Sequence, residues 1–318
     1  MSKYIYGIHE PSVEHIMEEQ DAIGWITFTH QLGLDDDNGF DYQPWTDRGF
    51  GVIARLNHGY GTQGTIPHPQ YYGRFAARCA RWVRNSVSGA PIVWIVGNEP
   101  GNKVEQPDGE PITPEMYTLC FNLCHEAMKE QMKTRGDLIA PAAIGPWNSE
   151  TADWLGYFGY VMTHTKPTAI ALHTYTHGTD PGLIFSEQTM NPPNQHRRYH
   201  FRAYRDFMER IPDDKRHLPI FITETCQLDP WANTNSGWVK NAYQDINDWN
   251  QSGQDRIVHA LVLYRGPKID KWYIEGKNGV IQDWAESMAH KYTWKKKPES
   301  VSRFACPNCG HLLEVKAV

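Results

Sequence analysis

The chain has 318 residues, of which 40% are hydrophobic and 12% aromatic, and its formal net charge at pH 7 is −6. This length fits one large domain or two modest ones, and the absence of a basic patch predicts that the protein does not bind nucleic acid. No run of residues reaches the roughly 18 consecutive apolar residues of a membrane span, and the N-terminus lacks a signal-peptide pattern. Together with the sparse cysteines, these features favour a protein of the reducing cytoplasm with no membrane contact, and a secreted protein is the alternative if an upstream signal has been removed.

Eight apolar stretches typical of strands follow one another along the chain, and helical spacing separates most of them. Strands are expected at residues 4–10, 24–30, 51–56, 91–97, 138–144, 169–175, 218–223 and 257–264. Helices are expected at 13–20, 71–87, 113–134, 149–162, 197–210, 236–251 and 280–292. This alternation, with no change of composition, predicts an α/β fold, namely a (β/α)8 TIM barrel over residues 1–294. Residues 295–318 are expected to form a separate tail.

Two of the predicted strands end in a glutamate. The run 91–97 is followed by Asn98, Glu99 and Pro100, and the run 218–223 is followed by Glu224. A desolvated carboxylate is costly in a purely structural sheet, and the carboxyl ends of barrel strands form the active site of this fold. We therefore expect both glutamates in one cleft. Other polar residues expected at the same strand ends are His9, Glu10, His30, Arg55, His173, Tyr175 and Tyr264.

Three of these motifs together resemble the clan A retaining glycoside hydrolases: Asn98-Glu99-Pro100, His173-x-Tyr175 and the strand-ending Glu224. The resemblance implies that Glu99 is the general acid/base, Glu224 the nucleophile, and Asn98 a donor to the sugar 2-hydroxyl group. Such enzymes cleave β-glycosidic bonds by double displacement, in which one carboxyl group holds a proton while the other stays ionised.

Several further residues are expected to bind substrate. Arg55 and Tyr175 should lie beside Glu224, where a positive charge and a hydrogen bond favour its ionised form. Aromatic side chains above the barrel can stack on sugar rings through their apolar faces, which favours an endo-acting enzyme on a poly- or oligosaccharide. The predicted substrate-binding residues, besides Asn98, are His9, Arg55, Trp147, His173, Tyr175, Trp231 and Tyr264.

The sequence departs from the family pattern at the eighth strand. Many clan A members close this strand with a tryptophan, whereas this chain has Tyr264-Arg265-Gly266, so the sugar is not identified. A non-catalytic glycan-binding barrel is the main alternative. A metal-dependent barrel hydrolase is a further one, but the 15 histidines are scattered and catalysis is expected to need no cofactor.

The tail contains a second motif, Cys306-Pro307-Asn308-Cys309-Gly310. This spacing is typical of the thiolate knuckles that bind zinc, but a closed structural site has four ligands and no second such pair follows. Two interpretations stay open: a structural zinc site within the chain, or a half-site that is completed either by a second chain through self-association or by further residues downstream. Cys120 and Cys124 are more typical of small buried residues on a helix.

Overall fold

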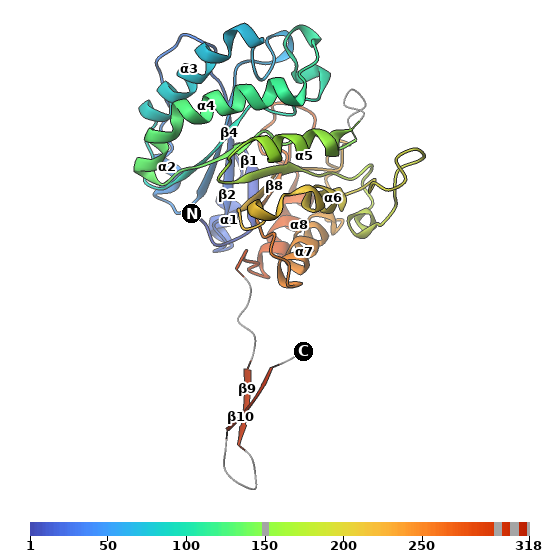
Figure 1. The fold of residues 1–318 in the computed structure, drawn as a ribbon. Helices are drawn as coiled ribbons and strands as arrows, with labels where there is room; N and C mark the ends of the chain where they lie inside the picture. Colours follow the sequence, from blue (N-terminus) through green and yellow to red (C-terminus); the bar gives the residue numbers. More distant parts are fainter. Residues whose placement is uncertain (148–152, 296–300, 306–311, 317–318) are drawn as a thin grey trace.

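The computed structural model describes residues 1–147, 153–295, 301–305 and 312–316. Eight parallel strands lie at the centre of the molecule, and helices lie outside them (Figure 1). The strands are β1 (Tyr6–His9), β2 (Trp25–Gln31), β3 (Gly51–Asn57), β4 (Ile92–Val96), β5 (Leu138–Pro141), β6 (Ile170–His173), β7 (Ile220–Thr225) and β8 (Val258–Leu263).

The strands form a barrel that is nearly closed. Their order is β5-β4-β3-β2-β1-β8-β7-β6, so β5 and β6 are the two ends of the hydrogen-bonded sheet. The chain entering β6 crosses this gap, because the main-chain N–H groups of Thr168 and Ala169 donate to the carbonyl oxygen of Ile139 at 2.9 and 3.0 Å. The predicted (β/α)8 barrel is therefore confirmed.

The helices follow the strands in the expected alternation. They are α1 (His15–Glu19), α2 (Gln43–Thr46), α3 (Tyr72–Asn85), α4 (Pro114–Arg135), α5 (Trp154–His164), α6 (Ala203–Arg210), α7 (Trp238–Gln251) and α8 (Asn278–Met288). Helix α4 begins as its sequence predicts, since the Thr113 hydroxyl oxygen accepts a hydrogen bond from the Met116 N–H group at 3.3 Å. No described helix has the length and apolar composition of a bilayer span.

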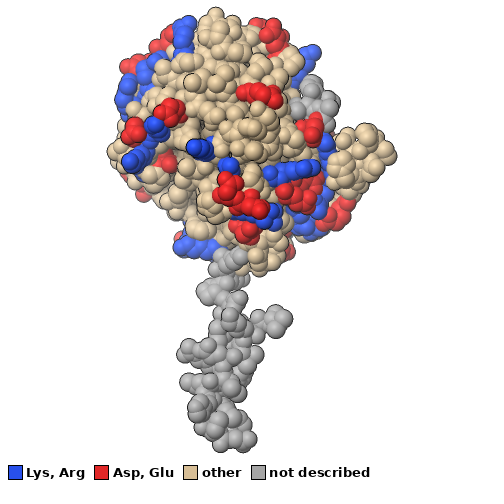
Figure 2. Space-filling view, in the orientation of Figure 1, with Lys and Arg blue, Asp and Glu red and all other residues tan. Residues whose placement is uncertain are grey.

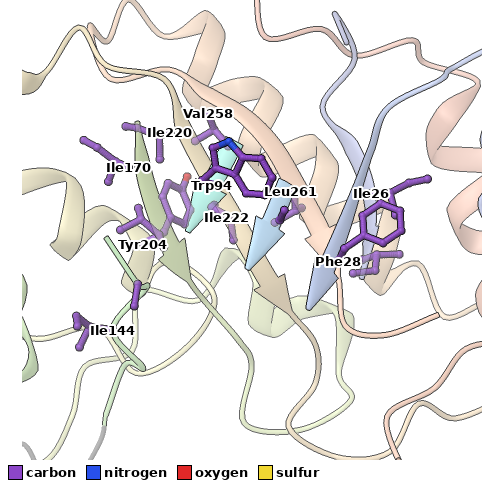
Figure 3. Close-up of a cluster of buried hydrophobic side chains, with 14 of the residues drawn as sticks. Ile26, Phe28, Trp94, Ile144, Ile170, Tyr204, Ile220, Ile222, Val258 and Leu261 are labelled. Carbon is purple, nitrogen blue, oxygen red and sulfur yellow. The ribbon is translucent and has the colours of Figure 1, made fainter. Parts of the chain in front are cut away.

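Alternate residues of each strand face two separate apolar layers. On β4, Ile92, Trp94 and Val96 belong to the layer between the strands and the helices, while Val93 and Ile95 belong to a second cluster inside the barrel. Figure 3 shows part of the outer layer, with Trp94 of β4 and buried apolar side chains of several other strands drawn as sticks. Burial on both faces explains why these strands read as continuous apolar runs.

The barrel interior is filled by side chains. Trp25 of β2 is fully buried there and contacts Phe221 of β7 edge to face, with ring centroids 5.0 Å apart. Gly51 on the neighbouring strand leaves the space for this indole, because a β-carbon at that position would lie 2.3 Å from the Trp25 ring. The barrel is therefore a packed core, and a substrate can be reached only from the strand ends.

The C-terminal tail forms an antiparallel hairpin apart from the barrel sheet, made of β9 (Val301–Ala305) and β10 (Leu312–Lys316) (Figure 1). Cys306 and Cys309 lie outside the described residues, so the predicted zinc site and self-association stay predictions. The segment just before the tail is bonded to the N-terminus of the barrel, because the Trp294 indole N–H group donates to the Ser2 carbonyl oxygen at 2.9 Å. Figure 2 shows acidic and basic side chains interspersed over one face of the barrel.

Candidate active site

A cleft of about 780 Å³ opens at the carboxyl ends of the strands. This is the size of a typical small-molecule or oligosaccharide site, and it lies where a (β/α)8 barrel places its chemistry. The cleft brings together residues that lie in each of the eight strands or in the loop that follows it. The predicted site residues that line it are His9, Arg55, Asn98, Glu99, Trp147, Tyr175, Glu224 and Tyr264.

Glu99 is held at the end of β4 by an unusual backbone conformation. Gly97 has φ of 78° and Glu99 itself has φ of 34°, a region that non-glycine residues rarely adopt. The Glu99 N–H group donates to the Ala143 carbonyl oxygen at 3.1 Å, which fixes this turn against the loop after β5. Strain of this kind is retained where a side chain must be aimed at a site.

The loop after β5 also leaves space for the Glu99 carboxyl group. A β-carbon at Gly145 would lie 2.9 Å from the Glu99 carboxyl carbon and 3.0 Å from both of its oxygens. We therefore expect Gly145→Ala to displace this carboxyl group and lower kcat by about 100-fold, the usual cost of misplacing a reacting group by about 1 Å. The measurement is steady-state kinetics on glycosides, the substrate class that the strand-end motifs imply.

Gly159→Ala is the matched control, because no heavy atom lies within 4 Å of a β-carbon at this position in α5. It should leave kcat unchanged and slightly stabilise the helix. Native kcat in a folded Gly145→Ala protein would contradict the role of Gly145.

Glu224 lies at the end of β7 among hydrogen-bond donors. The Arg55 guanidinium donates to Glu224 Oε1 at 2.7 Å, and the Tyr175 hydroxyl lies 3.0 Å from Oε2. Burial of Glu224 raises its pKa, but the positive charges of His173 and Arg55 outweigh burial and lower the pKa to about 2. Both neighbours predicted for Glu224, Arg55 and Tyr175, are therefore present, and the carboxyl group is ionised at neutral pH.

The two carboxyl groups share one hydrogen-bond network. His173 Nδ1 lies 2.7 Å from Glu99 Oε1, and the Tyr175 hydroxyl lies 3.3 Å from the same oxygen and 3.0 Å from His173 Nδ1. One oxygen of Glu99 and one of Glu224 lie within 4.8 Å of each other and of His173. His173 is fully buried and does not line the cleft, so its role is to position Glu99. This corrects the prediction that His173 binds substrate.

By distance alone, Glu99, His173 and Glu224 could hold a metal ion. However, the Arg55 guanidinium already occupies an oxygen of Glu224 at 2.7 Å, and a cation between the carboxyl groups would be repelled by it. The donor set therefore fits a hydrogen-bonded acid pair better than a metal centre.

Aromatic side chains form the walls of the cleft. Trp147 has its indole N–H group bonded to the Arg198 carbonyl oxygen at 2.8 Å and its ring 4.4 Å from that of His177. Tyr60, Tyr264 and Trp272 lie on other parts of the wall. These fixed rings present apolar faces suited to stacking on pyranose rings.

Trp231 lies outside this cleft, which corrects the prediction that it contacts substrate. Its side chain is 3% exposed, and its indole N–H group donates to the Tyr264 carbonyl oxygen at 2.7 Å. Its ring contacts that of Trp238 edge to face, with centroids 5.2 Å apart. Trp231 therefore supports the end of β8 from behind.

Some residues of the site have no signal in the sequence. Asn102 donates from its side chain to Glu99 Oε2 at 3.1 Å, and Glu105 accepts from the Asn98 side chain at 3.2 Å. Both lie in the loop after β4, and only their closeness to Glu99 in the chain could have suggested them. By contrast, Glu10 was expected at a strand end; it lines the cleft together with Arg265, and the two form an ion pair at 2.6 Å.

No protein-family model matches the chain, and no curated protein sequence is significantly similar to it. Solved structures do match. A GH128 subgroup II endo-β-1,3-glucanase from Sorangium cellulosum has 15% identity and a TM-score of 0.52, with 89% of this chain and 98% of that chain covered. A GH26 β-mannanase from Bacteroides ovatus has 11% identity and a TM-score of 0.54, with coverage of 91% and 88%.

A third match is GH5_18 from Streptomyces cattleya, solved in complex with GlcNAc. It has 11% identity and a TM-score of 0.50, and the alignment covers 92% of this chain and 80% of that chain. This chain has the fold of these glycoside hydrolases. The similarity extends over nearly the whole barrel, which agrees with the family resemblance that the strand-end motifs suggest.

Proposed function

We propose that the protein is a retaining glycoside hydrolase acting on β-glycosidic bonds. The carrying observation is the closeness of the two carboxyl groups at the ends of β4 and β7, where an oxygen of Glu99 and an oxygen of Glu224 lie within 4.8 Å. Retaining enzymes hold their carboxyl groups about 5–5.5 Å apart, whereas inverting enzymes need about 6.5–9.5 Å for a water molecule between sugar and base. So close an approach of one oxygen from each group is compatible with the retaining geometry and in this way supports double displacement.

The surroundings of each carboxyl group support different roles. Arg55 and Tyr175 hold Glu224 as an anion, which suits a nucleophile. Glu99 accepts one side-chain hydrogen bond from Asn102, lies 2.7 Å from His173 Nδ1 and lines the cleft, so with Glu224 held as the anion it is the carboxyl group left to give the leaving oxygen a proton. Glu99 is accordingly the acid/base residue.

The reaction follows from these positions. A Glu224 oxygen attacks the anomeric carbon, the bond to the leaving oxygen breaks, and the Glu99 proton moves to that oxygen. Water then attacks the same carbon, its proton passes to Glu99, and the bond to Glu224 breaks. The product keeps the configuration of the substrate, and both carboxyl groups return to their starting states.

The charges of the cleft favour an uncharged glycan. Its two arginines are already paired, Arg55 with Glu224 at 2.7 Å and Arg265 with Glu10 at 2.6 Å and Asp270 at 2.8 Å. Among the described residues, the cleft therefore offers no spare cation for the carboxylate of a uronic acid. The two matched structures named as a glucanase and a mannanase point to the same class of neutral polymer.

The deciding experiment is a glycan panel with analysis of the first product by NMR. We expect oligosaccharides from a β-glucan or a β-mannan, a β-configured new reducing end at early times, little action on uronate polymers, and no loss of rate with a chelator. An α-configured first product would contradict the retaining mechanism. Glycan binding without any turnover would favour the alternative of a non-catalytic binding barrel.

A further inference from the structure

Glu105 is a third carboxyl group in the cleft, beside the two of the proposed mechanism. It ends the short 3-10 turn Lys103–Glu105 in the loop after β4, and it lines the cleft. Its main chain is fixed on both sides, because its N–H group donates to the Asn102 carbonyl oxygen and its own carbonyl oxygen accepts from the Thr65 N–H group, each at 2.9 Å. The side chain is therefore presented to the cleft by a rigid backbone.

The side chain of Glu105 contacts Asn98. The Asn98 side-chain nitrogen donates to Glu105 Oε1 at 3.2 Å. The main-chain carbonyl oxygen of Asn98 accepts from the Thr65 hydroxyl group at 2.7 Å. An amide nitrogen carries two hydrogens, so one remains for a sugar hydroxyl group once Glu105 has taken the other. Among the described residues, Asn98 alone donates a hydrogen bond to the Glu105 carboxyl group, and it does so to Oε1, so Oε2 has no donor among them.

The ionisation of Glu105 is coupled to the other two acids. Burial, together with the negative charges of Glu99 and Glu224, raises the pKa of Glu105 to about 7. Below this pH Glu105 is a neutral acid that can both donate to and accept from a hydroxyl group. Above it, Glu105 adds a negative charge to a cleft that already holds Glu224.

We propose that Glu105 is a substrate-binding residue that orients the Asn98 amide and hydrogen-bonds, through its second oxygen, to a hydroxyl group of the sugar beside the scissile bond. This inference rests on the proposed glycosidase function. It assigns to the loop after β4 a direct part in substrate recognition. A residue that merely braced this loop would not need a side chain that faces the cleft and reaches Asn98.

Two substitutions separate binding from loop support. Glu105→Ala removes the hydrogen bond to Asn98 and the proposed hydrogen bond to the sugar. It should lower kcat/KM by about 10–100-fold, because a sugar hydroxyl contact is lost and the Asn98 amide is no longer oriented. Glu105→Gln keeps an oxygen that can accept from Asn98 but cannot ionise. It should retain activity near pH 5–6 within about 3-fold, and it should weaken the fall in rate that we expect of the native protein above about pH 7.

Glu110→Ala is the matched control, because its side chain lies in the same loop, is 72% exposed and does not line the cleft. It should leave both the rate and the pH profile unchanged. A double-mutant cycle between Glu105→Ala and Asn98→Ala should show less than additive losses, since the two side chains act on one sugar.

A binding measurement distinguishes failure of this inference from failure of the proposed function. The probes are a β-1,3-glucan and a β-mannan pentasaccharide, titrated by calorimetry into Glu224→Gln and into the Glu224→Gln/Glu105→Ala double variant. We expect the second variant to bind about 10-fold more weakly. Equal affinities of the two variants would overturn the role of Glu105 and leave the glycosidase proposal intact. The same conclusion would follow if Glu105→Ala were as active as Glu110→Ala and had an unchanged pH profile. Weaker binding with no turnover by native protein upholds Glu105 and overturns the reaction, and no binding of either sugar overturns both.

Discussion

Glu224→Gln abolishes turnover on every glycoside, with a loss of at least roughly 10⁴-fold, because the amide cannot form the covalent intermediate. The loss of rate in Glu99→Ala instead depends on the leaving group of the substrate. This variant should lose about 10²–10⁴-fold on a natural glycan, whose leaving oxygen needs a proton, and far less in the first step on an activated aryl glycoside. Burst and steady-state kinetics on both substrates measure this difference.

Glu99→Gln provides the isosteric comparison with Glu224→Gln, since each replaces one carboxyl group by an amide. Equal residual activity of the two glutamine variants on the activated glycoside would reverse or remove the assigned roles. The assignment also requires that both variants fold, which thermal unfolding can verify.

Arg55→Met shifts the acid side of the pH–rate profile upward by at least about one unit and lowers kcat/KM by roughly 100-fold. The reason is that Arg55 lies 2.7 Å from Glu224 and helps hold its pKa at about 2 against the effect of burial. Without this charge, the nucleophile takes up a proton at a higher pH. Arg55→Lys keeps a positive charge but not the geometry, so its profile should lie between the two.

The same substitution changes stability in a pH-dependent way. A carboxyl group whose pKa is lower in the folded than in the unfolded state stabilises the protein above its unfolded pKa and loses that contribution as pH falls toward about 2. Arg55→Met should therefore destabilise by about 3–5 kcal/mol near neutral pH, and by less in acid, because an unpaired buried charge remains only while Glu224 is ionised. Thermal unfolding at several pH values measures this.

Arg84→Met is the control for Arg55→Met. Its ion pair with Asp37, at 3.4 Å, lies at the surface, with side-chain exposures of 53% and 67%. Such pairs contribute roughly 0–1 kcal/mol, so neither the pH profile nor the unfolding temperature should change much. If Arg55→Met left the pH–rate profile and the unfolding temperature as unchanged as Arg84→Met does, Arg55 would not lower the pKa of Glu224.

The strand ends were predictable because a buried parallel strand is a continuous apolar run, and the point where it stops is visible in the sequence. Asn98, Glu99 and Glu224 follow such runs directly, and Arg55 and Tyr175 lie near the ends of β3 and β6. In a barrel all these ends meet on one face, so their convergence followed from the fold alone.

The residues that sequence could not place are those whose role depends on loop packing. Trp231 looks like any other loop tryptophan, and only its bond to the Tyr264 carbonyl oxygen shows that it faces inward. Glu105 lies in an irregular loop without periodicity. His173 was expected to contact a sugar, but the distance of 2.7 Å to Glu99 could not be read from spacing.

Helix α6 shows the same limit for secondary structure. Its periodic pattern suggests a start at residue 197, whereas the helix begins at Ala203. The preceding residues are drawn into the loop by tertiary contacts, including the bridge between Thr189 and Arg198 and the bond from the Arg198 N–H group to Asp206 at 2.7 Å. Helical propensity does not reveal such competition from the rest of the fold.

Trp25 fills the barrel interior over Gly51, so substitutions in the barrel interior should have different effects from substitutions in the loops of the cleft. A side chain at Gly51 would push Trp25 toward Phe221 on β7, so most substitutions there should prevent folding. Tyr60 and Trp272 lie at the cleft wall on loops, where, on the proposed function, replacement should alter which sugars bind at small cost to folding. We therefore expect loop substitutions to be tolerated at the cleft wall, whereas substitutions in the packed floor beneath the carboxyl pair should be costly to folding.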